Sequence, residues 1–189
     1  MQVISSILNL QTLYMVDEKT IEMLKESQNR IKSMSYIHEA LYQSRNLSHF
    51  NFTEYIQNLV SNLAQSYNLF KESVEVEFEL DQVYLGLDTA IPLGLVINEL
   101  VTNAFKYAFN ETGRGNLKIV LHLLENGNYS LVVADNGKGF PPEINFRSTE
   151  SLGLQLVTTL VQQIQGKINL DNEKGAIFTI LFKENQPEN

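Results

Sequence analysis

At 189 residues, the chain is long enough for one large domain or two small ones with a buried core. Hydrophobic residues make up 43% and charged residues 19%, which favours a folded protein over a disordered one. The absence of Cys excludes disulfides and thiolate chemistry, and the net charge of −8 argues against a surface for nucleic acid or anionic membrane. No apolar run is long enough to span a bilayer, so we expect no membrane contact by this segment.

Residues 1–45 are predicted to form an antiparallel helical hairpin. Two seams with three- and four-residue steps run from Ile4 to Met15 and from Ile21 to Tyr42; they are partly apolar and include polar residues such as Gln28. Asp17 is placed to cap the second helix. Such a hairpin has little inner surface, so we expect a second copy to complete a four-helix bundle in a homodimer. The first helix begins without a capping residue, as expected for a chain cut within a helix.

Residues 46–189 are predicted to form a separate domain after a linker near residues 45–51. Asn51 and Glu54 have the spacing of a helix N-cap, for a helix that runs to about Tyr67. The later elements are expected to be a strand at 74–80, a helix at 88–108, strands at 117–124 and 129–134 around an Asn126–Gly127 turn, a mobile loop at 136–150, a helix at 152–165 that Gly166 ends, and strands at 167–170 and 176–182. The predicted fold class is therefore α+β, a helical hairpin followed by an α/β sandwich.

The predicted helix at 88–108 carries a group of polar side chains near its end. Glu99, Asn103, Lys106 and Tyr107 follow one another at helical spacing, which places carboxylate, amide and ammonium on one face. An amide oxygen and a carboxylate can hold hydrated Mg²⁺, and a Lys can neutralise phosphate oxygens. An ordinary amphipathic helix with solvated polar residues would have the same pattern, so this segment alone leaves both interpretations open.

Three further motifs could contribute to a ligand site. Asp135 follows an apolar strand and precedes Gly137 and Gly139, so its carboxylate could accept a hydrogen bond from an exocyclic amine where the glycines admit a ligand. Gly153 lies in the first turn of a helix, where N–H groups bind anions, and Thr179 could reach a bound base from the last strand. Each motif alone is also typical of a turn, a helix start or a strand.

In order and spacing, the four motifs together resemble the ATP-binding fold of histidine kinases, Hsp90-type chaperones, DNA gyrase subunits and mismatch-repair ATPases, the GHKL fold. More narrowly, Gln2–Gln11 and Ser33–Gln43 resemble the dimerisation helices of HisKA_2-type sensor histidine kinases. The resemblance implies an ATP-dependent protein-histidine kinase of a two-component system, with ATP and Mg²⁺ as cofactors. It also implies a response-regulator receiver domain as partner, dimerisation through the N-terminal helices and a cytoplasmic location.

On the phosphate side of the nucleotide, the resemblance implies that Asn103 is the Mg²⁺ ligand. Glu99 would be a polar partner of the metal or its water, and Lys106 and Tyr107 would face the phosphates or the ribose. The segment Gly153–Leu154 would close over the phosphates. Glu99 and Lys106 would be the catalytic residues, and catalysis would consist mainly of positioning and electrostatic stabilisation of the γ-phosphoryl group by Mg²⁺, Lys106 and main-chain amides of the segment that closes over the phosphates.

On the base side, the resemblance implies that Asp135 holds the adenine amine. Gly137 and Gly139 would line the base pocket, and Thr179 would support the adenine. These roles come from the resemblance and not from the spacing of the residues.

The chain has three histidines, His38, His49 and His122. The acceptor histidine of the resembled subfamily would lie about half a dozen residues before the position of Met1, so the resemblance implies a chain that binds nucleotide but cannot autophosphorylate. His38 is the alternative acceptor, because His-Glu begins the acceptor motif of many other kinases. It matches the second dimerisation helix, however, at a position that points into the bundle, and it lacks the downstream Arg-x-Pro-like context; the other two histidines lack motif context. We therefore predict that all three are structural.

Two other functions share the nucleotide fold. An ATP-gated partner-binding protein of the anti-sigma type would lack the long helical hairpin of residues 1–45. A GHKL ATPase that uses Glu99 as base would need a further domain after the last strand.

Overall fold

The computed structural model describes residues 50–67, 73–109, 113–140, 145–149 and 151–184, together with scattered positions among residues 6–35. The chain separates into two compact units, Met1–Arg45 and Asn46–Asn189. Their assignment to dimerisation and nucleotide binding stays a prediction.

In the first unit, the described positions at 6–11 and 20–35 are helical. The main-chain N–H of Thr20 donates to Asp17 Oδ2 at 2.9 Å, which confirms Asp17 as the cap of the second helix. Three apolar side chains at three- and four-residue spacing are exposed to solvent, Ile7 and Leu10 on the first helix and Tyr14 in the turn after it.

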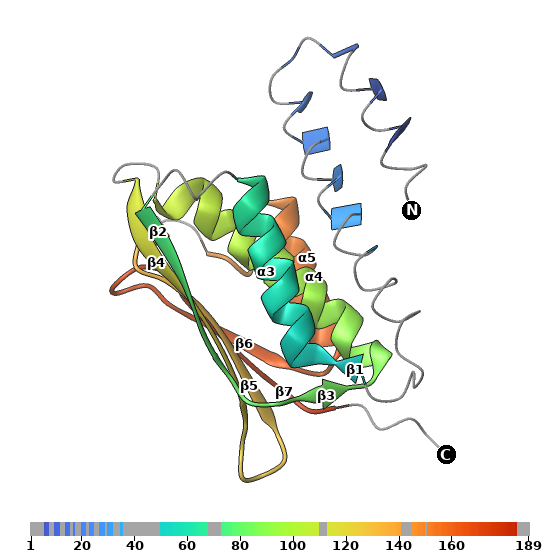
Figure 1. The fold of residues 1–189 in the computed structure, drawn as a ribbon, viewed down its shortest axis with the longest axis vertical. Helices are drawn as coiled ribbons and strands as arrows, with labels where there is room; N and C mark the ends of the chain where they lie inside the picture. The colour runs from blue at the N-terminus through green and yellow to red at the C-terminus, as the bar shows by residue number, and fades with distance from the viewer. Residues whose placement is uncertain are drawn as a thin grey trace. The chain divides into compact units, whose positions relative to one another are not determined.

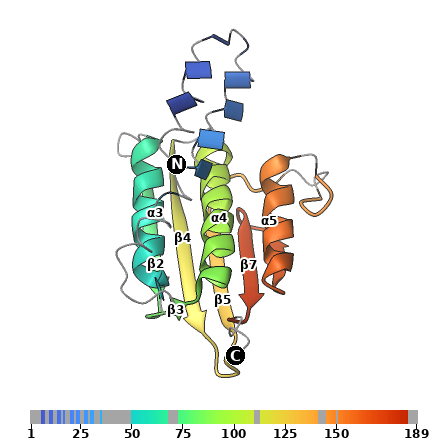
Figure 2. The same cartoon turned by 90° about the vertical axis from the view of Figure 1, so that its right-hand side faces the viewer.

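The second unit is an α/β sandwich, as predicted. Its elements are β1 (Phe50–Asn51), α3 (Phe52–Ser66), β2 (Ser73–Leu80), β3 (Tyr84–Leu85), α4 (Leu87–Asn103), a π-helical turn η2 (Ala104–Ala108), β4 (Arg114–Leu123), β5 (Tyr129–Asp135), α5 (Leu152–Gln163), β6 (Lys167–Asp171) and β7 (Ile177–Phe182). Five strands form one sheet in the order β2-β4-β5-β7-β6, parallel between β2 and β4 and antiparallel elsewhere. Helices α3, α4 and α5 lie side by side against one face of the sheet, with α4 in the middle (Figures 1 and 2).

The core lies between these helices and the sheet. Alternate residues of the central strands are fully buried, among them Leu117, Ile119 and Leu131. They pack towards the helix layer, where Ile97 and Val157 are equally buried. Burial of each such side chain contributes about 1.5–3 kcal/mol, so the core anchors the strand ends that carry the polar motifs.

Helix α3 begins as its sequence predicts. Asn51 Oδ1 accepts the Glu54 N–H at 3.2 Å, and the Asn51 amide donates to the Glu54 carboxylate at 3.1 Å. The side chain of Asn has an NH₂ donor as well as an oxygen acceptor. The Glu54 carboxylate therefore accepts a hydrogen bond from the Asn51 side chain and not from the Asn51 main-chain N–H. The cap therefore resembles a capping box in spacing but not in its second hydrogen bond.

Three details differ from the predicted elements. The short pairing of β1 with β3 was not predicted, because strands of two residues show no periodicity. Regular α-helix ends at Asn103, and the last predicted turn is π-helical. After α5 it is Gln165, with φ +54°, and not Gly166 that adopts the left-handed conformation.

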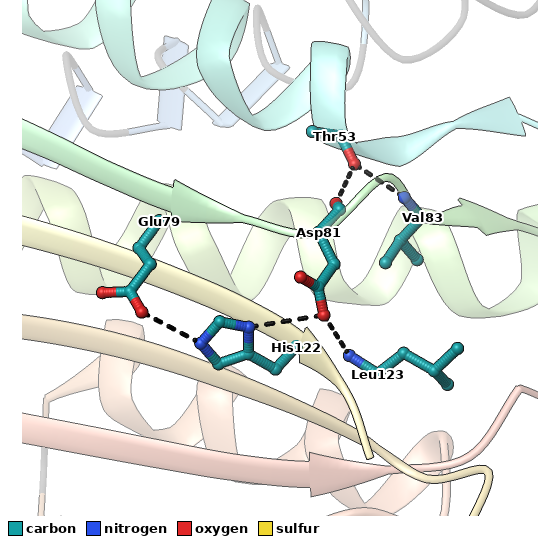
Figure 3. A network of polar contacts seen from close by, with 6 residues as sticks. All are labelled: Thr53, Glu79, Asp81, Val83, His122 and Leu123. Atoms are coloured by element: carbon teal, nitrogen blue, oxygen red, sulfur yellow. Dashed lines mark hydrogen bonds and ion pairs between the residues drawn. The ribbon is translucent and has the colours of Figure 1, made fainter. Parts of the chain in front are cut away.

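A polar network joins β2, β4 and α3 (Figure 3). His122 lies between two carboxylates, with Nε2 at 3.3 Å from Glu79 and Nδ1 at 3.3 Å from Asp81. The same Asp81 oxygen accepts the Leu123 N–H at 2.9 Å, and the Asp81 carbonyl accepts the Thr53 hydroxyl at 2.7 Å. Asp81 thus connects this end of the sheet to the first turn of α3.

We predict that Asp81→Asn flattens the acid dependence of stability. The Leu123 N–H, with a smaller contribution from His122, holds the pKa of Asp81 below its usual range. A carboxylate with a lowered pKa stabilises the fold above its unfolded pKa, and this contribution is lost as the pH falls through the folded pKa. Tm measured between about pH 5 and pH 3 should therefore fall less in Asp81→Asn than in wild type.

Glu75→Gln is the matched control, because Glu75 is an exposed carboxylate on the same strand as Glu79. It should retain the wild-type fall in Tm. If Tm fell with pH as steeply in Asp81→Asn as in wild type, the network would not contribute to stability in acid.

Candidate functional site

A cavity of about 310 Å³ opens in the second unit, next to the end of α4 and the start of α5. Its walls come from α4 and η2, the end of β5 and the loop after it, the start of α5, and β7 with the residue before it. The lining residues are Leu100, Asn103, Ala104, Tyr107, Ala108, Val133, Asp135, Lys138, Gly139, Phe140, Thr149, Ser151, Leu154, Ala176 and Phe178. The cavity is therefore mostly apolar with a few polar groups, as is typical of small-molecule sites.

Asp135 is the carboxylate of this cavity, and it is 9% exposed. Its Oδ1 accepts the Gly137 N–H at 2.9 Å and the Ala176 N–H at 3.3 Å. Burial raises the pKa of Asp135, and these two main-chain donors oppose the rise. Since Oδ1 is held by the main chain, Oδ2 is the oxygen that can accept a hydrogen bond from a ligand.

The two predicted glycines shape the loop after Asp135. A Cβ on Gly137 would lie 2.4 Å from the carbonyl oxygen of Ala108, so only glycine lets the loop approach the end of η2. Gly139 lines the cavity with φ +68°, a left-handed conformation that favours glycine. Gly137 thus acts on the loop from outside the lining, whereas Gly139 forms part of it.

Of the four polar residues predicted on α4, the structure brings Asn103 and Tyr107 to the cavity but not Glu99 or Lys106. Glu99 is 4% exposed, and its Oε1 accepts the side-chain amide of Asn98 at 3.3 Å. Lys106 lies in η2, where bonds run from i to i+5, so each turn holds more residues than an α turn. The lining residues of this segment nevertheless keep three- and four-residue spacing, from Leu100 and Asn103 to Tyr107, and Lys106 lies beside this stripe.

The start of α5 forms another wall. Leu154 lines the cavity, and Gly153 is buried beside it in the first turn. Ser151, the residue before the helix, also lines the cavity. N–H groups in a first helical turn lack intrahelical acceptors and favour anions, so this wall suits the anionic part of a ligand.

The last strand reaches the cavity through different residues from the one predicted. Thr179 does not line the cavity, whereas Ala176 and Phe178 do. Successive residues of a strand point to opposite faces, so Thr179 lies on the other face of the sheet from Phe178. The geometry does not support contact between Thr179 and a base in this cavity.

Sequence reasoning missed several lining residues, chiefly Lys138, Phe140 and Phe178. The rings of Phe140 and Phe178 meet edge to face, with centroids 5.7 Å apart. Asn172 holds the main chain of Phe140 with two hydrogen bonds, at 2.6 Å and 2.7 Å. The alternation of β7 could have identified Phe178 as inward-facing, but no local pattern predicts its contact with Phe140, 38 positions earlier in the sequence.

His122 lies on β4 and is not among the lining residues of the cavity. Both of its ring nitrogens face carboxylates (Figure 3), which agrees with a structural histidine. His38 and His49 lie outside the described residues, so their structural role stays a prediction.

The described residues contain no group of three or more His, Cys, Asp or Glu side chains that could hold a metal ion. Asn103 does line the cavity, and its side-chain amide oxygen is a suitable ligand for Mg²⁺. Mg²⁺ in nucleotide sites usually has few protein ligands, and phosphates and water supply the others. The residues present therefore fit Mg²⁺ that arrives with a phosphorylated ligand.

In the described part of the chain, none of the helices combines the length and apolar character needed to cross a bilayer.

Comparisons with curated proteins find sensor histidine kinases. The chain is 28% identical over 176 residues to sensor histidine kinase PdtaS of Mycolicibacterium smegmatis, covering 90% of this chain and 34% of the relative. It is 26% identical over 98 residues to blue-light-activated histidine kinase 2 of Erythrobacter litoralis, covering 52% of this chain and 28% of the relative. The chain thus spans about a third of the length of the curated relatives that it matches.

Solved structures share the fold. The histidine kinase domain of the Erythrobacter litoralis EL346 blue-light activated histidine kinase superposes with a TM-score of 0.77 at 17% identity, covering 94% of this chain and 93% of that chain. The Acinetobacter baumannii histidine kinase AdeS superposes with a TM-score of 0.63 at 22% identity, covering 96% of this chain and 95% of that chain. At these identities the likeness concerns the fold.

Two families match in succession along the chain. Residues 1–67 match the HisKA_2 histidine kinase family, and residues 88–186 match the family described as histidine kinase-, DNA gyrase B-, and HSP90-like ATPase. The second match covers more than half of the chain and includes every lining residue of the cavity. The chain therefore belongs to the histidine kinase-, DNA gyrase B- and HSP90-like ATPases, with HisKA_2-type helices before the ATPase domain.

Proposed function

We propose that this chain is the catalytic, ATP-binding portion of a sensor histidine kinase. Such a kinase transfers the γ-phosphoryl group of ATP to a histidine, from which an aspartate of a response-regulator receiver domain accepts it. The observation that carries the proposal is the succession of a HisKA_2 match and an ATPase match in one chain, the second of which contains the cavity. The HisKA_2 match favours a kinase over both an anti-sigma type protein and a GHKL ATPase.

In this proposal, the cavity binds the nucleotide between its carboxylate and the start of α5. Asp135 Oδ2 accepts the adenine amine while Phe178 contacts the base, and the wall at Ser151 and Leu154 faces the phosphates. Asn103 would hold Mg²⁺, which supplies charge neutralisation at the γ-phosphoryl group when it is bound. Catalysis then consists mainly of positioning the γ-phosphoryl group near a neutral imidazole.

Glu99 and Lys106, the two predicted catalytic residues, do not line the cavity, so we propose other roles for them. Glu99 is buried outside the lining, so we propose that it acts on the site through α4 and not by touching the nucleotide. Lys106 is partly exposed in η2, next to Tyr107, and would approach only phosphates that extend past the lining.

Homodimerisation is part of the proposal. The exposed apolar residues Ile7 and Leu10 on the first helix and Tyr14 in the turn after it follow one another at three- and four-residue spacing. A second copy that covers this stripe would complete the four-helix bundle expected for HisKA_2-type helices. A cytoplasmic location fits this role, since ATP and receiver domains are found there.

Incubation with γ-labelled ATP tests the proposal. We expect the chain to bind ATP, to retain no stable label and to release little phosphate, because His122 is engaged by two carboxylates and the other two histidines lack acceptor context. Stable label on His38 would contradict the assignment of the acceptor. Steady phosphate release without transfer to any histidine would favour a GHKL ATPase.

The Mg²⁺ assignment gives a separate prediction for Asn103→Ala. Loss of one charge-assisted contact should weaken binding of ATP in Mg²⁺ by about 10-fold, and binding in EDTA should stay unchanged. Calorimetric titration in both buffers measures the difference. Asn169→Ala, at an exposed position on β6, is the matched control and should bind ATP like wild type in both buffers.

An equal loss for Asn103→Ala in Mg²⁺ and in EDTA would show that Asn103 contacts the nucleotide itself and not the metal.

A further inference from the structure

The side chain of Arg147 attaches the segment Asn145–Thr149 to the edge strand β6. Arg147 Nη2 donates to the carbonyl oxygen of Ile168 at 2.8 Å, and its guanidinium carbon lies 5.4 Å from the ring centroid of Phe146. The Arg147 N–H also donates to Asn145 Oδ1 at 3.0 Å. Arg147 therefore links the segment, the Phe146 ring and the main chain of β6.

The other contacts of this segment lead to the cavity. The ring of Phe146 meets Phe178 edge to face at 5.7 Å, on the residue of β7 that lines the cavity. Thr149 lines the cavity itself; its hydroxyl accepts the Ser151 N–H at 3.1 Å, and its carbonyl accepts the Gln155 side chain at 2.9 Å. The segment is thus held by β6 at one end and by α5 at the other.

We propose that Arg147 is a positioning residue for the bound nucleotide. Through Phe146 it supports the ring of Phe178, and through the main chain it holds the wall formed by Thr149 and Ser151. This inference rests on the proposed function, because the ligand whose binding it controls is ATP. Arg147 is not among the lining residues, so it acts without touching the nucleotide.

An arginine is required here for a geometric reason. A planar guanidinium can place its face on an aromatic ring while its edge donates a hydrogen bond in the same plane. A lysine ammonium carries the charge but has no planar face to lay on a ring, so it is not expected to reproduce both contacts in the same geometry. We therefore expect Arg147→Lys to keep part of the contribution that Arg147 makes to holding the nucleotide, and Arg147→Ala to lose that contribution.

The test is the dissociation rate of a fluorescent ATP analogue in stopped flow. In Arg147→Ala we expect dissociation about 3- to 10-fold faster with little change in the association rate, since a mobile wall releases ligand sooner. Arg147→Lys should be intermediate. Lys167→Ala is the matched control, because it removes a positive charge from the exposed residue before Ile168. The ATP analogue should dissociate from this variant at the wild-type rate.

A second readout needs no nucleotide. Amide hydrogen exchange at Ser151 in the free protein should accelerate in Arg147→Ala, whereas Val133 on β5 should exchange as slowly as in wild type.

Unchanged ATP dissociation in Arg147→Ala would overturn the inference, and so would equal acceleration in Lys167→Ala. A wild-type chain that binds no ATP would overturn the proposed function instead. In that case, unchanged exchange at Ser151 in Arg147→Ala would still overturn the positioning role.

Discussion

Asp135→Asn is expected to lower ATP affinity by about 10- to 100-fold without unfolding the protein. Asp135 Oδ1 already accepts two main-chain N–H groups, from Gly137 and Ala176. An asparagine satisfies these donors only with its oxygen, which turns its NH₂ group towards the ligand. Two donors, the asparagine NH₂ and the adenine amine, would then face each other.

The same geometry predicts a change in base preference. A 6-oxo purine presents an acceptor where adenine presents an amine, so ITP should lose less affinity than ATP in Asp135→Asn. Competition of both nucleotides against a fluorescent ATP analogue measures this. Thermal unfolding is the control for stability: since burial raises the pKa of Asp135 and disfavours its charged form, a neutral side chain should be tolerated. Equal losses for ATP and ITP would contradict the assignment of Oδ2 to the base.

Phe178→Ala should cause the largest loss of stability among the cavity residues. Phe178 is 4% exposed, and its ring contacts both Phe140 and Phe146 edge to face. Truncation of a buried Phe costs about 3–5 kcal/mol, which corresponds to a fall in Tm of about 10 °C for a chain of this size. Because the cavity loses part of its wall, ATP affinity measured well below Tm should fall as well.

Phe182→Ala separates the two effects. Phe182 is equally buried on the same strand and stacks on Tyr129, but it does not line the cavity. It should lose similar stability in thermal unfolding and keep wild-type ATP affinity. If Phe178→Ala bound ATP as tightly as Phe182→Ala, Phe178 would be a core residue without a role in the nucleotide site.

Local signals in the sequence predicted most of the fold. The helix starts at Asp17 and Asn51 have side chains that satisfy N–H groups within three residues, so neighbours in sequence contain all the information needed. The hairpin between β4 and β5 follows from the Asn126–Gly127 turn in the same way. The parallel pairing of β2 with β4 has no such signal, because it joins strands that are separated by α4.

The sequence predicted a site residue correctly where its position within one strand or loop was enough to place its side chain. Asp135 lies at a strand end next to glycines, and the structure places its carboxylate in the cavity. Thr179 was predicted from its hydroxyl and from the resemblance, but strand alternation turns it away from the side that Phe178 faces. Arg147 could not be predicted, because its contact with Ile168 depends on how the chain returns to the edge of the sheet.

The π-helical turn at Ala104–Ala108 has a consequence for any comparison of this helix with others. Closing a turn from i to i+5 uses one residue more than closing it from i to i+4, so the turn is equivalent to a one-residue insertion in an α-helix. A relative with an uninterrupted helix would reach the same cavity wall with a chain one residue shorter. After this turn, an alignment without a gap would be one residue out of step with an uninterrupted helix, so residues that follow Ala108 should be compared by position in space.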